Sequence, residues 1–102
     1  MGTMRAVMTR LYQRNDDFVH RCIAGEHLLI ALHRREATPL YAFSATSAAV
    51  WEQLESWRSP EALADALAER FAVSREEALG DVSSLLDQLE SIGALHARQD
   101  AP

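Results

Sequence analysis

A strand-like segment passes directly into a helix-like one between Tyr41 and Glu55, in the stretch YAFSATSAAVWEQLE. The aromatic residues just before Ser44 are typical of a short strand, here residues 40–43. Beyond Ser44, apolar residues recur at the spacing of one helical face, at Val50, Trp51, Leu54 and Trp57. Because a serine side chain accepts hydrogen bonds from the free amides of a first helical turn, Ser44 is the expected N-cap.

Two further strands are predicted before this switch. Residues 18–23 alternate in polarity, and HLLIALH follows at residues 27–33. Between them lies AGE at residues 24–26, in which Gly25 can adopt positive φ in a tight turn. The three segments make the smallest sheet that is stable, provided that helices cover one face.

Two more helices are predicted after the switch, each with its own start signal. Ser59 is a cap followed by Pro60 at the first helical position, and Leu63, Leu67 and Phe71 recur every four residues. Ser74 and Glu77 form a capping box, and Gly93 can close the third helix in a left-handed conformation. The third apolar stripe is Leu79, Val82, Leu86, Leu89 and Ile92.

This order predicts the α+β class, with a three-stranded antiparallel sheet followed by three helices. A chain of 102 residues has room for one such domain, which we place at residues 18–96. We expect residues 1–17 to be a flexible N-terminal segment and residues 97–102 a C-terminal tail. The single cysteine and the lack of a long apolar run favour a soluble cytoplasmic protein with no membrane partner.

Catalytic and cofactor motifs are missing from the sequence, which predicts a protein that is not an enzyme and has no cofactor. The glycines do not form a phosphate-binding loop, and no nucleophile has a base at a usable spacing. His20 and Cys22 lie two apart and could form a metal site with His27 or His33, but one pair at this spacing is a weak signal and no metal is predicted. The acidic residues after Ser59 follow the polar faces of two helices, as solvated side chains do.

Three segments together resemble the family of coenzyme PQQ synthesis protein D, the PqqD-like peptide chaperones. They are GEHLLIAL, LYAFSATSAAVWEQLE and SPEALADALAERFAVSREEALGDVSSLLDQLESIGAL. The resemblance covers about residues 18–96. It departs from the family pattern at Ser44, where Asn is frequent, and at Ser47, where Gly is frequent.

The resemblance implies a small winged helix-turn-helix fold and a binding function. Members are RiPP recognition elements, which bind the leader region of a ribosomally made precursor peptide and deliver it to a modifying enzyme, frequently a radical SAM protein. The peptide is expected to add as a strand beside residues 40–43, with side chains against the third helix. The expected contact residues are Leu40, Tyr41, Ala42, Phe43, Ser44, Asp81, Ser84, Leu85 and Gln88.

The helix positions among these residues follow from helical spacing, and Leu85 is equally well explained as a core residue. The strand positions have a separate physical reason. Residues 40–43 are short and follow a connecting loop, so they are expected at a sheet edge, where free backbone groups can pair with an extended peptide.

A winged-helix DNA-binding regulator is the main alternative, because the same architecture presents a helix to the major groove. Residues 59–92 carry eight acidic residues against Arg70 and Arg75, a balance that phosphates repel, so no nucleic-acid partner is predicted. An assembly module using the same edge strand, or a homodimer through it, are the remaining alternatives.

Overall fold

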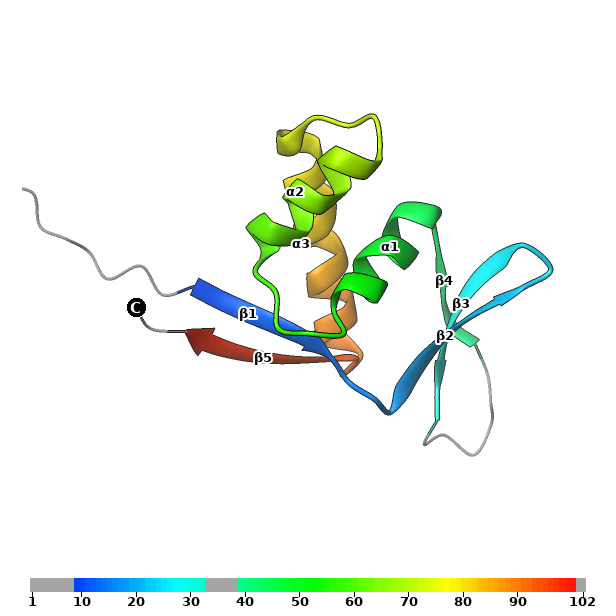
Figure 1. Cartoon of the computed structure of the whole chain (residues 1–102). Helices are drawn as coiled ribbons and strands as arrows, with labels where there is room; N and C mark the ends of the chain where they lie inside the picture. The colour runs from blue at the N-terminus through cyan, green and yellow to red at the C-terminus, as the bar shows by residue number, and fades with distance from the viewer. Residues whose placement is uncertain (1–8, 33–38, 101–102) are drawn as a thin grey trace, which may run out of the picture.

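The computed structural model describes residues 9–32 and 39–100, which form five strands and three helices (Figure 1). The α+β class predicted from the sequence is confirmed. The elements, in chain order, are β1 (Thr9–Arg14), β2 (Phe18–Ile23), β3 (Glu26–Ala31), β4 (Pro39–Phe43), α1 (Ala45–Gln53), α2 (Pro60–Arg70), α3 (Arg75–Ser91) and β5 (Leu95–Asp100).

Strands β2, β3 and β4 form the predicted antiparallel sheet, in that spatial order. The β2–β3 turn consists of Ala24 and Gly25, which have φ of 52° and 82°. Two successive residues at positive φ match the right-handed twist of a hairpin, which explains the glycine. On β3, Leu29 and Ala31 are buried, whereas Ile30 between them is only half-buried, so one face of the sheet meets the core.

Each helix begins at the serine that the sequence predicts. The side chains of Ser44, Ser59 and Ser74 each accept a hydrogen bond of 3.1 Å from the backbone amide three residues later. At the end of α3, Gly93 has φ of 79°, and the amide of Ala94 donates to the carbonyl of Leu89 at 2.9 Å. These caps satisfy backbone groups that a helix end leaves free.

The first helix is shorter than its apolar stripe predicts. It ends at Gln53, with Leu54 as its C-cap, so Trp57 lies in the loop before α2. The guanidinium of Arg98 lies 4.4 Å from the centre of the Trp57 ring, a cation–π distance. Trp57 was therefore wrongly assigned to the helix, because a contact with β5 holds it outside.

The helices and both groups of strands share one hydrophobic core. Helices α2 and α3 pack against each other, and α1 lies between this pair and the three-stranded sheet (Figure 1). None of the helices in the described ranges is long and apolar enough to cross a bilayer. The most completely buried large side chains are Trp51, Leu29, Leu54, Leu63, Leu86, Leu89, Val50 and Val82.

Both ends of the described chain are more ordered than the sequence predicts. Strand β1 lies within the segment expected to be flexible, and it pairs antiparallel with β5, which takes up most of the expected C-terminal tail. Tyr12 is 7% exposed and exchanges two backbone hydrogen bonds of 2.9 Å with Arg58. The prediction was wrong because this pairing joins segments that are far apart in sequence, whereas periodicity reports local structure. Residues 1–8 and 101–102 of those expected segments lie outside the described residues.

The buried position of Tyr12 predicts that β1 contributes to global stability. Replacing Tyr12 with Ala should lower the free energy of unfolding by about 3 kcal/mol, because the change empties part of the core. Urea denaturation followed by circular dichroism measures this change. Gln99→Ala on the exposed part of β5 is the matched control and should change stability by less than about 0.5 kcal/mol. Equal, small effects of both substitutions would show that β1 is not part of the cooperative unit.

Candidate functional site

Strand β4 lies at the edge of its sheet. It pairs with β3 alone, so its other edge has no partner strand in the described part of the chain. Tyr41 and Phe43 point toward the helices, where they are half-buried and buried, and Ala42 between them is exposed. The strand also includes Leu40, so four of the predicted contact residues lie on an open edge with free backbone donors and acceptors.

A groove of about 300 Å³ lies at the junction of α1 and α3, next to the end of β4. Five of the nine predicted contact residues line it, because positions i, i+3, i+4 and i+7 of α3 share one helical face. Its lining residues are Ser44, Thr46, Ser47, Asp81, Ser84, Leu85 and Gln88. Sequence reasoning missed Thr46 and Ser47, although their hydroxyl groups directly after an N-cap were an available signal.

Leu85 is both a core residue and a groove residue, the two alternatives that the sequence left open. Its side chain is 6% exposed and packs in the core, and it also lines the groove. It therefore forms an apolar floor between polar walls.

The polar groups of the groove differ in how far they are already hydrogen bonded. The hydroxyl of Ser44 lies 2.9 Å from that of Thr46 and donates to that of Ser47 at 3.0 Å. By contrast, among the described residues the side chains of Asp81, Ser84 and Gln88 have no hydrogen-bond or ion-pair partner. The wall formed by α3 thus offers the groups that are free to bind a ligand.

Aromatic contacts hold the edge strand against the core. The ring centre of Phe43 lies 6.0 Å from that of Trp51 on α1 and 5.6 Å from that of Tyr41. Pairs at this separation contribute attraction beyond simple burial. The position of β4 relative to α1 is therefore set by the packing of Tyr41 and Phe43 on the face of the strand that meets the core.

Two histidines lie on the neighbouring strands of the same sheet, His20 on β2 and His27 on β3. The Nε2 atom of His20 on β2 and the Nδ1 atom of His27 on β3 are 2.9 Å apart, and the rings stack with their centres 5.1 Å apart. The ring of His20 also lies 5.9 Å from that of Phe43. Cys22 on the same strand is exposed, and the described residues include no group of three side chains able to hold a metal ion. His33, the other candidate ligand, lies outside the described residues.

The surroundings of His20 lower its pKa. Burial is the main cause, and the neighbouring His27 and Arg21 act in the same direction, while Glu52 on α1 opposes them. A short hydrogen bond between two imidazoles also requires one ring to accept, which a doubly protonated pair cannot do. The folded protein therefore binds a proton at His20 less readily than the unfolded chain.

This direction predicts a loss of stability in mild acid. Because the pKa of His20 is lower in the folded state than the usual value of about 6.5, the free energy of unfolding should fall as the pH drops through that value. Urea denaturation at about pH 7.5 and about pH 5.5 should show a larger loss for the natural chain than for His20→Gln. His96→Gln, at an exposed position on β5, is the control and should keep the full loss. The same loss in His20→Gln would assign the effect to other groups.

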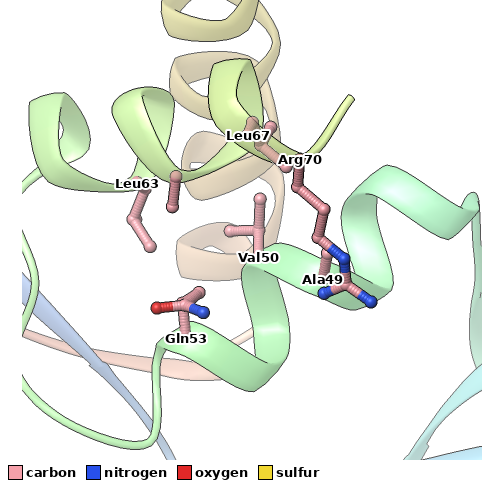
Figure 2. Close-up of a pocket in the computed structure, with 7 residues that line it drawn as sticks. Ala49, Val50, Gln53, Leu63, Leu67 and Arg70 are labelled. Atoms are coloured by element: carbon pink, nitrogen blue, oxygen red, sulfur yellow. The ribbon is translucent and has the colours of Figure 1, made fainter. Parts of the chain in front are cut away.

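A second hollow lies between α1 and α2 (Figure 2). Figure 2 shows the side chain of Arg70 of α2 reaching toward Ala49 of α1, beside the apolar side chain of Val50. Its interior volume of about 10 Å³ is close to the minimum for a single water molecule. This hollow is therefore too small to bind a ligand, and the larger groove beside β4 is the candidate site.

The described residues thus form a small α+β domain with a free sheet edge beside a helix-lined groove. The family model for coenzyme PQQ synthesis protein D (PqqD) matches residues 26–95, and the chain belongs to this family. The resemblance seen in the sequence is thereby confirmed.

Two solved structures have the same fold. One is TbiB1 in complex with the TbiA(beta) leader peptide, which is 25% identical, with a TM-score of 0.65 over 82% of this chain and 94% of that one. The other is lasso peptide synthetase B1 complexed with the leader peptide, at 19% identity and a TM-score of 0.66 over 83% of this chain and 96% of that one. The second supports the fold alone. A comparison with curated proteins gave no match.

Proposed function

We propose that this protein is a RiPP recognition element that binds the leader region of a ribosomally synthesised precursor peptide. The observation that carries the proposal is the open edge of β4 beside the groove of α1 and α3. Membership of the PqqD family and similarity to TbiB1, which was solved with a leader peptide, support it.

Strand addition is the binding mode that this edge supports. An extended peptide beside β4 would pair with the backbone groups that no described strand occupies, which gives affinity for many sequences. Alternate side chains of that peptide would point to the same face as Tyr41 and Phe43, toward the groove. Selectivity would then come from the residues on α3.

Binding followed by delivery to a separate enzyme fits the groove better than catalysis does. The hydroxyl groups of Ser44, Thr46 and Ser47 bond to one another and to a backbone amide, and not to a general base. We infer that the chemistry is performed in the cytoplasm by a partner enzyme, for which a radical SAM protein is the family expectation.

The acidic surface of α3 disfavours DNA as the ligand. Glu76, Glu77, Asp81 and Asp87 are all exposed on this helix, and its one arginine, Arg75, is hydrogen bonded to Asp65 at 2.6 Å. A helix with this charge would be repelled by the phosphate backbone.

The proposal is tested by recovering the tagged protein from its native cells and identifying the bound peptides, proteins and nucleic acids. Recovery of a small precursor peptide together with a modifying enzyme is expected. Recovery of DNA, of a second copy of the chain alone, or of a large assembly that lacks a precursor would refute the proposal.

Strand addition predicts that a backbone change at Ala42 impairs binding. Ala42→Pro removes an amide donor and constrains the edge strand, so peptide affinity should fall by about tenfold or more. Fluorescence polarisation with the recovered peptide measures affinity, and urea denaturation measures stability, which should change far less. Ala42→Ser changes the exposed side chain and keeps the amide, so it should bind normally. Normal binding by Ala42→Pro would refute strand addition.

A further inference from the structure

We propose that the groove selects leader peptides in which an arginine or lysine faces Asp81 of α3. The inference rests on the proposed function, because it concerns the side chains of a peptide added beside β4. It specifies the chemical class of that peptide, which neither the fold nor the family assigns.

The first reason is that the carboxylate of Asp81 lines the groove without a partner. It is exposed, and it makes no hydrogen bond or ion pair with any described residue. Glu77, one turn earlier on α3, is also exposed, and its side chain is likewise free of such partners among the described residues. Two carboxylates four residues apart on a helix repel each other, and a cation between them would relieve that repulsion.

The second reason is that several acidic residues elsewhere on the described surface, although not all of them, are paired with arginines, whereas Asp81 is not. Four ion pairs of 2.5 to 3.8 Å account for Glu90, Glu55, Glu52 and Asp65, paired with Arg10, Arg14, Arg70 and Arg75. Within the part of the chain that the structure describes, no arginine lines the groove. The side of α3 that faces the groove therefore has an uncompensated negative charge, which a ligand can complement.

The third reason is the arrangement of acceptors and apolar surface around Asp81. Ser84 and Gln88 follow on the same helical face and carry oxygen atoms that can accept hydrogen bonds from a guanidinium or an ammonium group. Leu85 forms the apolar floor between them, suited to the aliphatic stem of such a side chain. An acidic peptide side chain would meet repulsion here.

Strand geometry adds a spacing to this preference. Because side chains alternate across a strand, the peptide residue two positions from the cationic one would also face the core side of the sheet. There it would lie near the half-buried ring of Tyr41. The expected leader segment therefore places an apolar residue two positions from an arginine or lysine.

The experiment is a selection from displayed random peptides of roughly ten residues with the full chain as bait. The baits are the natural chain, Asp81→Asn, Asp81→Lys, Asp87→Lys and Ala42→Pro. Asp87→Lys is the matched control, because it makes the same change of charge on α3 at an exposed residue outside the groove.

The natural chain and Asp87→Lys should enrich peptides with an arginine or lysine two positions from an apolar residue. Asp81→Asn should bind those peptides about three- to tenfold more weakly, and Asp81→Lys should enrich acidic residues at the same position. Enrichment of peptides without a cation, or an unchanged cation preference in Asp81→Lys, overturns this inference and leaves the proposed function standing. Equal enrichment by Ala42→Pro overturns strand addition at β4, and no enrichment by the natural chain overturns the proposed function as well.

Discussion

The contact between Phe43 and Trp51 is the interaction on which the site depends. Phe43 is the last residue of β4, and Trp51 is 2% exposed on α1, with the two ring centres 6.0 Å apart. Since Ser44 starts the helix directly after the strand, this contact sets the angle between the sheet and α1. It also buries one face of β4, whose outer edge has no partner strand among the described residues.

The groove follows from the same junction. Its walls are the first turn of α1, whose start Ser44 determines, and one face of α3, whose buried side includes Val82, Leu86 and Leu89. Packing of that apolar side against the core leaves Asp81, Ser84 and Gln88 lining the groove. The packing of the core thus fixes where these polar side chains lie. Among the described residues they have no hydrogen-bond partner, so they can bind a ligand.

Local signals predicted most of the fold, and they did so where each signal acts within a few residues. Serine caps, the Ala24–Gly25 turn and Gly93 all behave as their local chemistry predicts. The β1–β5 pairing and the loop position of Trp57 were missed because both depend on partners distant in sequence. For the site, helical spacing identified the α3 residues, whereas the meeting of Thr46 and Ser47 with them required the packing of α1 against α3.

The sequence by itself determined the order and type of the central elements, because hydrophobic period, caps and turn residues are properties of short segments. It also determined the acidic character of α3. Only the tertiary structure decided that β1 pairs with β5, that Leu85 is both core and groove floor, and that His20 and His27 meet at 2.9 Å. These properties arise from contacts between segments that are distant in sequence, and a local sequence pattern does not show which distant segments come into contact.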